Sequence, residues 1–371
     1  MRPLLYLLLA TVLLSSCGRQ TAARQDGGDT VAFKYARRLS VVRHDGYTEV
    51  TLQNPWQTDK TLHRYLLVPH DAPLPELPEG TVIRTPLRRS AVFTTVHCAL
   101  LQLLHTEGSI AGVADLKYIK LPYIHEQVRA GRIADCGEAM SPTIEKLIDL
   151  RPDAVLLSPF ENSGGYGRLE GIGVPLVECA DYMEPTPLGR AEWLRFYGML
   201  FGCEQRADSL FAVVDSSYNA LKAVAGRSKV VRSVVFDKMM GSVWYVPGGQ
   251  STVGQLLADA RCSYPWAHDE HGGSVSLPFE TVLERAGECD VWLLRYSSDH
   301  PLSYEELLAE HRGYDRFRAF QRHEVYGCNV SLSQFYEETP FRPDWLLADY
   351  IQLLHPDIPN LPPLRYYQKM P

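Results

Sequence analysis

Two stretches of sequence decide the fold, IEKLIDLRPDAVLL at residues 144–157 and FETVLERAGECDVWLL at residues 279–294. Each has a glutamate near its start and apolar residues at helical spacing, and each ends in an apolar run behind an aspartate. The first part predicts an amphipathic helix, and the apolar run predicts a buried strand. Because one chain carries this unit twice, we expect two similar α/β lobes.

The sequence around each unit alternates between strand and helix patterns. Residues 81–186 contain strand-like runs such as VIRTPL, IAGVAD and DAVLLSP, separated by helical stretches, and residues 229–371 repeat the alternation. Such alternation favours parallel sheets covered by helices. We therefore predict an α/β protein with two Rossmann-like lobes, an N-terminal lobe over 81–186 and a C-terminal lobe over 229–371.

The segment between the lobes, residues 187–228, has a helical pattern. Trp193, Phe196, Tyr197 and Leu200 recur at helical spacing, and we expect Gly202 to divide two helices. The second helix, of about 22 residues, would be about 33 Å long. A rigid linker helix of this kind permits only small movements of the lobes.

A β-rich extension precedes the first lobe, over residues 31–80. Two alternating runs flank Asp45 and Gly46, a pair typical of hairpin turns, and HRYLLVP supplies a third strand. The proline-rich stretch PHDAPLPELPEG then separates the extension from the lobe. The pattern assigns no function to this extension.

The first residues, MRPLLYLLLATVLLSSC, have the layout of a secretory signal. The ending LSSC resembles a bacterial lipobox, which predicts cleavage before Cys17 and lipid attachment to it; the alternative is an ordinary signal peptide with a chance cysteine. Residues 18–30 are small and polar, as in a flexible tether. Residues 1–17 thus comprise the signal peptide and the lipidated cysteine, and we expect an exported protein that faces the periplasm and is anchored to the membrane through the lipid on Cys17.

The composition argues against nucleic acid as a partner but does not decide whether the cysteines form disulfides. The chain is 45% hydrophobic and 22% charged with a net charge of −7, a globular composition that argues against nucleic-acid binding. The seven cysteines after Cys17 are scattered and form no CxxC pair, which argues against a zinc or redox site. We expect buried small apolar residues, and one or two disulfides remain an alternative.

Five segments together carry a family resemblance: LSSC, SPTIEKLIDLRPDAVLLS, PLGRAEW, WYVPGGQSTVGQLLADA and FETVLERAGECDVWLL. In combination they resemble the substrate-binding lipoproteins of ABC importers in which a rigid helix joins two α/β lobes. That class takes up iron–siderophore complexes, haem and cobalamin. The resemblance covers residues 80–355 and leaves out the β-rich extension.

The resemblance implies a docking role for two glutamates. In this family a surface glutamate on each lobe binds arginines of the membrane permease, and by position these are Glu145 and Glu280. Two carboxylates on two rigid lobes define both spacing and orientation for a partner. The alternative is that each is a solvated residue favoured at a helix start by the helix dipole.

The ligand is expected between the lobes, on loops that follow the strands. These loops are rich in glycine, serine and aromatic residues, and aromatic faces would clasp a flat macrocycle or a catecholate chelate. Arginines there could meet carboxylates or an anionic ferric chelate. The candidate ligand-binding residues are Arg88, Arg89, Tyr118, Tyr166, Trp244, Tyr245, Arg295, Tyr296 and Tyr336.

We expect a monomeric carrier that delivers a siderophore-type iron chelate to a permease, with no cofactor and no metal site of its own. Corrinoid or haem binding is the first alternative. Direct binding of a transition-metal ion is the second, through His97 or through the loop residues His268, Asp269, Glu270 and His271. An enzyme is disfavoured, because the sequence contains no G-x-S-x-G, H-E-x-x-H or Walker motif.

Overall fold

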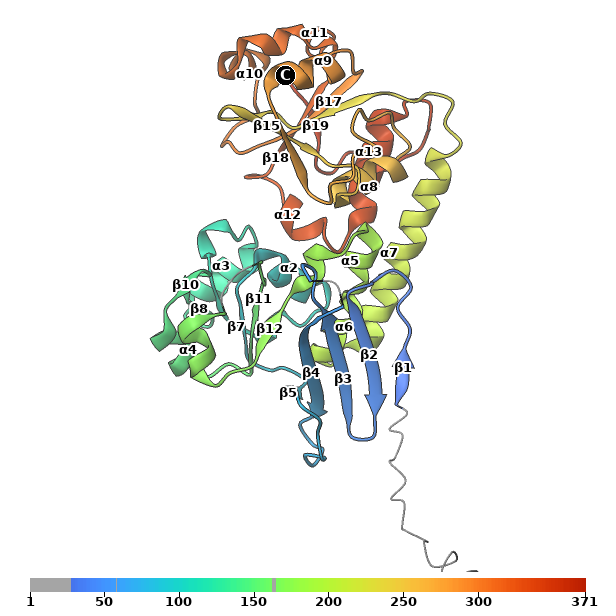
Figure 1. Cartoon of the computed structure of the whole chain (residues 1–371). Coiled ribbons are helices and arrows are strands. Elements are labelled where there is room, and N and C mark those ends of the chain that lie inside the picture. The colour runs from blue at the N-terminus through green and yellow to red at the C-terminus, as the bar shows by residue number, and fades with distance from the viewer. Residues whose placement is uncertain (1–27, 58, 162–164) are drawn as a thin grey trace, which may run out of the picture.

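The computed structural model describes residues 28–57, 59–161 and 165–371. The proposed signal peptide, Cys17 and residues 18–27 of the tether lie outside the described residues. Two α/β lobes are stacked one above the other, and a separate β-sheet packs beside the lower, N-terminal lobe (Figure 1). The two-lobed α/β fold predicted from the repeated helix–strand unit is confirmed.

The N-terminal extension is a five-stranded sheet with the order β1-β2-β3-β4-β5. Its strands are β1 (Asp29–Val31), β2 (Leu39–His44), β3 (Tyr47–Gln53), β4 (Thr61–Pro69) and β5 (Thr81–Thr85). The hairpin turn falls at Asp45 and Gly46 as expected, with Gly46 at φ 85°. β5 pairs in parallel with β4, so the extension continues to Thr85 and the boundary predicted at residue 80 is wrong. The sequence TVIRT is compatible with a strand in either sheet. Only its pairing with β4 shows that it belongs to the extension.

This sheet shares its hydrophobic core with the linker. Val50, Leu52 and Tyr65 are fully buried, and the ring of Tyr65 lies 6.3 Å from that of Phe196 on a linker helix. Two buried carboxylates hold the strand-free segment 33–38 against the linker. Glu192 accepts the backbone N–H groups of Lys34, Tyr35 and Ala36, and Glu184 accepts those of Arg37 and Arg38. The extension is therefore an integral part of the N-terminal half.

The N-terminal lobe is built on a parallel sheet with the order β12-β11-β6-β7-β8. Its strands are β6 (Ser90–Val92), β7 (Ile110–Val113), β8 (Ala134–Asp135), β11 (Ala154–Leu157) and β12 (Leu176–Glu178), with a short hairpin of β9 (Gly137–Glu138) and β10 (Ser141–Pro142). The helices are α2 (Thr95–Leu103), α3 (Pro122–Arg129) and α4 (Ile144–Leu150), with 3₁₀ turns η1 (Glu107–Ser109), η2 (Leu116–Tyr118), η3 (Gly167–Ile172) and η4 (Ala180–Met183). All four strand pairings are parallel, as the alternating pattern predicts.

The C-terminal lobe has two sheets. The main sheet has the order β13-β17-β18-β19, with β13 (Val234–Phe236), β17 (Val291–Tyr296) and β18 (Val325–Asn329) parallel and β19 (Gln368–Lys369) antiparallel. The smaller antiparallel sheet contains β14 (Met239–Met240), β15 (Val243–Pro247) and β16 (Ser274–Leu277). The helices are α8 (Thr252–Asp259), α9 (Phe279–Ala286), α10 (Tyr304–Glu310), α11 (Arg318–Gln321), α12 (Phe335–Glu338) and α13 (Pro343–Leu354), with η5 (Arg312–Arg316).

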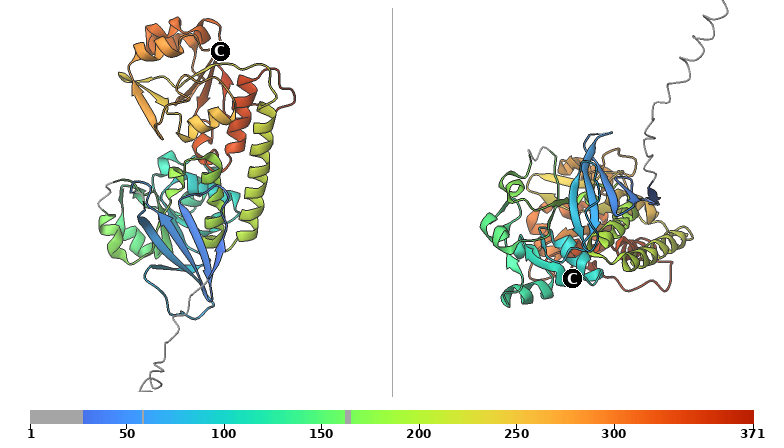
Figure 2. Two further views of the ribbon diagram at one scale, coloured as in Figure 1. Left: turned by 45° about the vertical axis from the view of Figure 1, so that its right-hand side comes forward. Right: turned by 90° about the horizontal axis from the view of Figure 1, so that it is seen from below.

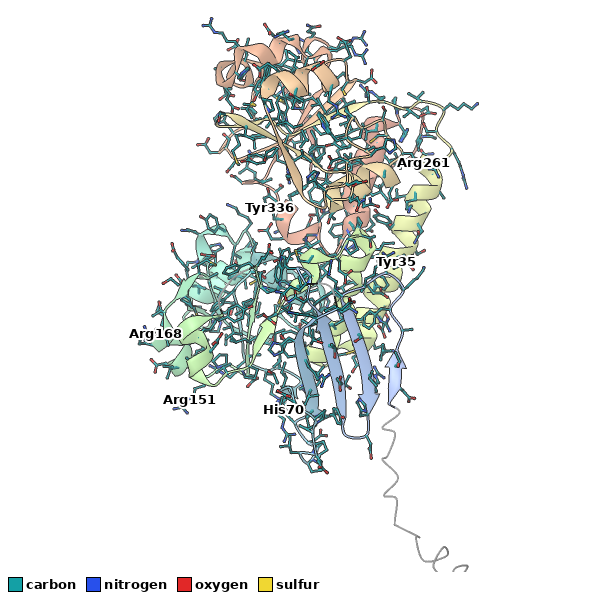
Figure 3. All side chains as sticks on the ribbon, in the orientation of Figure 1. Tyr35, His70, Arg151, Arg168, Arg261 and Tyr336 are labelled. Carbon is teal, nitrogen blue, oxygen red and sulfur yellow. The ribbon has the colours of Figure 1, made fainter. Side chains whose placement is uncertain are left out.

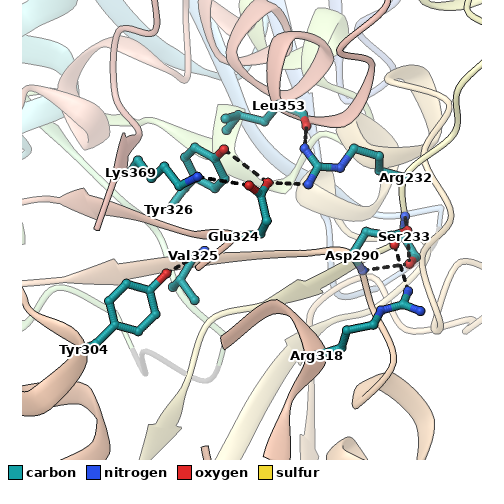
Figure 4. A network of polar contacts seen from close by, with 10 residues as sticks. All are labelled: Arg232, Ser233, Asp290, Tyr304, Arg318, Glu324, Val325, Tyr326, Leu353 and Lys369. Atoms are coloured by element: carbon teal, nitrogen blue, oxygen red, sulfur yellow. Dashed lines mark hydrogen bonds and ion pairs between the residues drawn. The ribbon is translucent and has the colours of Figure 1, made fainter. Parts of the chain in front are cut away.

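Polar contacts join the amino ends of the parallel strands in the C-terminal lobe (Figure 4). Asp290, just before β17, accepts the backbone N–H of Ser233, just before β13, at 2.9 Å and pairs with Arg318 at 2.8 Å. Glu324, just before β18, pairs with Arg232. These contacts occupy the amino edge of the sheet, so the carboxyl edge remains for ligand binding.

The linker contains α5 (Pro187–Glu192), α6 (Leu194–Phe201) and α7 (Glu204–Ala225). Gly202 ends α6 in the left-handed conformation at φ 66°, which is the division expected from the sequence. α7 has 22 residues and runs along one side of both lobes (Figure 2). Among the described residues, no helix has the length and apolar character needed to cross a membrane.

The cysteines of the described chain are all free thiols. Five of the seven are buried, as expected for small apolar residues, and the alternative of disulfides finds no support among them. Burial raises the pKa of Cys98 to about 12, and that of Cys262 likewise to about 12. A thiol with so high a pKa is not a nucleophile near neutral pH.

Candidate functional site

The carboxyl edges of the two main sheets face one another. Thr95 follows β6 in the N-terminal lobe, and its hydroxyl donates to Glu337 of the C-terminal lobe at 3.0 Å. The backbone N–H of Lys120, which follows β7, donates to the same carboxylate at 3.3 Å. Glu337 itself lies beyond the carboxyl end of β18. In open parallel sheets ligands bind at this edge, so the space between the lobes is the candidate site.

A cavity of about 680 Å³ opens at the carboxyl edge of the N-terminal lobe. Its walls are the residues that follow β6, β7 and β11, the β9–β10 hairpin, and the starts of α4 and η3. The lining residues are Phe93, Thr94, Thr95, Val96, Asp115, Tyr118, Ala139, Met140, Ser141, Pro142, Ile144, Leu157, Ser158, Phe160, Gly165, Tyr166, Gly167, Arg168 and Leu169. A volume of this size is within the range of small-molecule sites.

Three aromatic side chains line this cavity and make part of its surface apolar. Tyr118 and Phe160 remain 61% and 41% exposed at its rim, which leaves their ring faces available to a ligand. The hydroxyl of Tyr166 donates to Glu178 at 2.6 Å and thereby fixes its ring. Burial and the neighbouring Glu178 raise the pKa of Tyr166, so the phenol stays neutral. The two exposed rings, beside the fixed ring of Tyr166, suit a flat or aromatic ligand.

Arg168 adds a positive charge to the cavity wall; it ends a loop where the ligand was expected, SPFENSGGYGR at residues 158–168, but was not named as a contact. Its guanidinium pairs with Glu145 at 3.1 Å, and both side chains are mostly exposed. Figure 3 shows Arg168 at the outer part of the N-terminal lobe. Phe93, Met140 and Phe160 also line the cavity; Phe93 and Phe160 lie in loops where the ligand was expected but were not named as contacts, and Met140 was missed. Phe93 lies directly after the strand SAV, and this position was the signal that could have identified it.

The C-terminal lobe contributes a more polar wall. Tyr296 is the last residue of β17 and lines two cavities, of about 410 Å³ and about 490 Å³. Around them lie Lys238, which pairs with Glu310, and the serines 297 and 298. This surface offers hydroxyl groups and charged pairs.

A narrow crevice of about 210 Å³ lies between the lobes, next to the linker. Arg295 and Tyr336 from the C-terminal lobe line it together with Val96 and Arg190. Arg295 is held by Asp237, with Nε and Oδ1 3.0 Å apart, so its charge is already compensated. Tyr336 is 47% exposed and lies on the face of its lobe that is turned toward the other lobe (Figure 3).

Trp244 does not belong to the site, contrary to the expectation from the sequence. Its side chain is fully buried, its Nε1–H donates to the carbonyl of Phe236 at 2.8 Å, and its ring stacks on Trp292 at 5.7 Å. Side chains alternate along β15, so Trp244 points inward and Tyr245, which is 42% exposed, points outward. Tyr245 lies outside the four cavities described above.

Arg88 and Arg89 also lie away from the cavities, at the amino end of β6. Their backbone N–H groups donate to Asp153 at 2.7 Å and 2.9 Å. The side chain of Arg89 donates to the carbonyl of Leu150 at 3.0 Å. The sequence prediction placed them after the first strand of the lobe because VIRTPL was taken as that strand. Since VIRT belongs to the extension, these arginines precede the first strand and face the opposite edge of the sheet.

Glu145 and Glu280 occupy matching positions. Each is exposed and lies in the first turn of its helix, α4 or α9. The backbone at the helix start and the guanidinium of Arg168 lower the pKa of Glu145, so it is charged at neutral pH. Their placement is compatible with the docking role, which stays a prediction.

His97 is a buried structural residue. Its Nε2 lies 2.9 Å from Asp181 and 2.8 Å from the Tyr197 hydroxyl, and Arg190 pairs with the same aspartate at 2.9 Å. Burial alone would lower the pKa of His97, but Cys179 and Asp181 raise it to about 10. Both ring nitrogens already have partners, Nδ1 the Thr94 hydroxyl and Nε2 Asp181 and Tyr197, so neither is left for a metal ion.

The loop at residues 268–271 gives no sign of a metal site either. His271 pairs with Asp269 at 2.8 Å, and His268 and Glu270 are exposed. In the part of the chain that the structure describes, no group of three or more histidine, cysteine, aspartate or glutamate side chains is arranged to hold an ion.

Two α/β lobes on a helical linker, with a cavity at the facing carboxyl edges, define a two-lobed solute-binding protein. The sequence pattern of the periplasmic binding protein family matches residues 91–331, and the chain belongs to that family. Two relatives in Methanocaldococcus jannaschii are named uncharacterized lipoproteins. Both are 25% identical over 353 residues, and the alignments cover 88% and 91% of this chain and 83% and 86% of the relatives.

Solved structures share the fold at low sequence identity. A periplasmic haem-binding protein from Pseudomonas aeruginosa has a TM-score of 0.59 at 16% identity, over 77% of this chain and 98% of its own. An Fe³⁺-hydroxamate transport protein from Saccharomonospora viridis has a TM-score of 0.55 at 20% identity, over 72% and 93%. These similarities establish the fold, while the ligand has to be argued from the site.

Proposed function

We propose that the protein captures an iron-chelate ligand of the siderophore type between its lobes and delivers it to the permease of an ABC importer. The observation that carries this proposal is the aromatic cavity at the carboxyl edge of the N-terminal lobe; a more polar surface lies at the end of β17 in the C-terminal lobe. A chelate with an aromatic or apolar periphery and polar groups near the metal would match both surfaces. Among the candidates named from the sequence, Tyr118, Tyr166 and Tyr296 line the cavities and are the proposed ligand contacts, with Arg295 and Tyr336 at the crevice.

Haem or a corrinoid is the second candidate. The exposed faces of Tyr118 and Phe160 suit a flat macrocycle, and one solved structure with this fold is that of a haem-binding protein. Direct capture of a metal ion has no comparable support, since the described residues contain no cluster of ligating side chains. A carrier needs no catalytic groups, and we infer that the ligand is returned unchanged.

Delivery requires an anchor and a docking surface. Lipid attached to Cys17 would hold the exported protein at the membrane, and the two archaeal relatives are named lipoproteins. Glu145 and Glu280, one on each lobe, would pair with arginines of the permease. We expect a monomer that docks with both lobes at once.

A fluorescence titration tests the ligand. Intrinsic fluorescence would be followed while the protein is titrated with a ferric hydroxamate, a ferric catecholate, haemin, cyanocobalamin and free Zn²⁺. We expect saturable quenching by a ferric chelate, and mass spectrometry of the released ligand should show it unchanged. Saturable binding of free Zn²⁺ alone, lost in His268→Ala with His271→Ala, would refute the proposal.

Charge reversal tests docking. Glu145→Arg combined with Glu280→Arg should abolish uptake in cells and leave ligand affinity unchanged. Glu305→Arg is the matched control, because Glu305 is also an exposed glutamate in the first turn of its helix, α10. Uptake that survives the double reversal, or a loss of ligand affinity, would show that these glutamates are not docking residues.

A further inference from the structure

One short segment of the C-terminal lobe reaches into the N-terminal lobe. We call residues 335–341, which comprise α12 and the three residues after it, the interlobe strap. α12 lies at the underside of the C-terminal lobe, directly above α2 (Figure 1). The strap has a polar contact near its start and an apolar contact at its end.

The polar contact is made by Glu337. This side chain is only 2% exposed, and its Oε1 accepts both the Thr95 hydroxyl at 3.0 Å and the backbone N–H of Lys120 at 3.3 Å. Thr95 is the first residue of α2, where the helix dipole also favours a carboxylate. Thr95 is also part of the wall of the main cavity. The polar contact therefore lies directly at the candidate ligand site.

The apolar contact is made by Phe341. It is fully buried, and its ring lies 6.0 Å from that of His97 and 5.9 Å from that of Tyr197, both edge-on. His97 and Tyr197 are fixed in turn by Asp181. Exposing such a ring to water is costly, whereas water can replace the partners of a carboxylate.

We propose that Glu337 is a releasable latch between the lobes and that Phe341 is the fixed point about which they open. Opening the cleft breaks the contacts of Glu337 with Thr95 and Lys120 and leaves Phe341 seated on His97 and Tyr197. Because Thr95 belongs both to the latch and to the cavity wall, an occupant of the cavity touches the latch directly. This inference does not depend on which ligand the cavity binds.

Hydrogen exchange of the Lys120 amide reports the latch without any ligand. The measurement uses the full-length protein and compares Glu337→Met, which keeps the side-chain length without an oxygen acceptor, with Glu337→Gln, which keeps a neutral acceptor. Glu338→Met is the matched control, because Glu338 is the next residue of α12 and its side chain accepts hydrogen bonds from Arg365 and Tyr366, both in its own lobe.

We expect the Lys120 amide to exchange about ten- to a hundredfold faster in Glu337→Met, since a hydrogen bond to a charged acceptor is lost. Glu337→Gln should show a smaller acceleration, and Glu338→Met none. Protection of core amides in β6 and β17 serves as the check that each variant is folded. Wild-type exchange at Lys120 in Glu337→Met, or equal acceleration in Glu338→Met, would overturn the latch, and neither result would bear on ligand capture.

Discussion

Asp153 and Asp290 make the same contact in the two lobes. Asp153 immediately precedes β11 and accepts the backbone N–H of Arg89, before β6, at 2.9 Å. Asp290 immediately precedes β17 and accepts the backbone N–H of Ser233, before β13, also at 2.9 Å. In each lobe the aspartate of the repeated unit joins the amino ends of two neighbouring parallel strands. The repeat seen in the sequence thus has a structural cause.

Removing either aspartate should lower stability without changing ligand binding. Asp153→Ala and Asp290→Ala each leave backbone donors without an acceptor, and we expect a loss of about 1–3 kcal/mol in the free energy of unfolding. The effect should be larger for Asp290, which also loses Arg318. Denaturant unfolding measures it, with Asp149→Ala, an exposed position on α4, as the control. Equal stability of all three variants would contradict this role.

Trp244 should matter for folding and not for ligand affinity. Trp244→Ala removes a fully buried ring from a cluster that includes Trp292, and we expect a cost of about 3–5 kcal/mol in the free energy of unfolding. Tyr245→Ala, at the neighbouring outward position, should change stability by less than about 0.5 kcal/mol. Calorimetry together with titration of the folded fraction separates the two quantities. A weaker ligand affinity in folded Trp244→Ala would return this residue to the site.

Tyr118 and Phe160 should show the opposite behaviour. Both rings are exposed at the cavity rim, so their loss costs little stability but removes contact area from a bound ligand. We expect Tyr118→Ala and Phe160→Ala each to weaken binding of the responding chelate by about 1–2 kcal/mol. Tyr245→Ala serves as the control, because it removes an exposed ring outside the cavity. Unchanged affinity in both cavity variants would move the ligand site elsewhere.

The sequence predicted those features that local signals encode. The turn at Asp45 and Gly46, the break at Gly202 and the 22-residue α7 each follow from the residues at that place. The parallel sheets follow from the alternation of strand and helix patterns. Tyr118 and Tyr166 were predicted because they lie in loops behind strands, and both line the main cavity; their contact with a ligand stays a prediction.

The predictions that failed depend on how strands pair in the tertiary structure, which the local sequence does not encode. Residues 81–85 could join either sheet, and assigning them to the lobe moved Arg88 and Arg89 to the wrong edge. Trp244 and Tyr245 are adjacent, and only the register of β15 with β16 shows which one points inward. Arg168 and Glu145 are 23 positions apart in sequence, and no local sequence pattern predicts that they pair.

Glu192 should hold the N-terminal segment in place. Its carboxylate is 1% exposed and accepts three consecutive backbone N–H groups, those of Lys34, Tyr35 and Ala36. We expect Glu192→Ala to accelerate hydrogen exchange of these amides by about tenfold or more, because each amide loses a hydrogen bond to a charged acceptor. Glu204→Ala, at an exposed glutamate of α7, is the control. Unchanged exchange at residues 34–36 would show that another contact fixes the segment.

The buried His97–Asp181 pair should make stability depend on pH in alkaline solution. The pKa of His97 is raised to about 10 in the folded protein, so its contribution is complete below the unfolded pKa near 6.5 and is lost as the pH rises through about 10. Asp181, with a pKa lowered to about 2, loses its contribution only in strong acid, from about pH 4 downward.

We expect the free energy of unfolding to fall between pH 7 and 10 by up to about 1.4 kcal/mol per pH unit, because one proton is lost from the folded protein. His97→Gln should be less stable at pH 6 and should lack this slope, whereas His268→Gln, at an exposed histidine, should keep it. A wild-type slope in His97→Gln would mean that another group binds the proton.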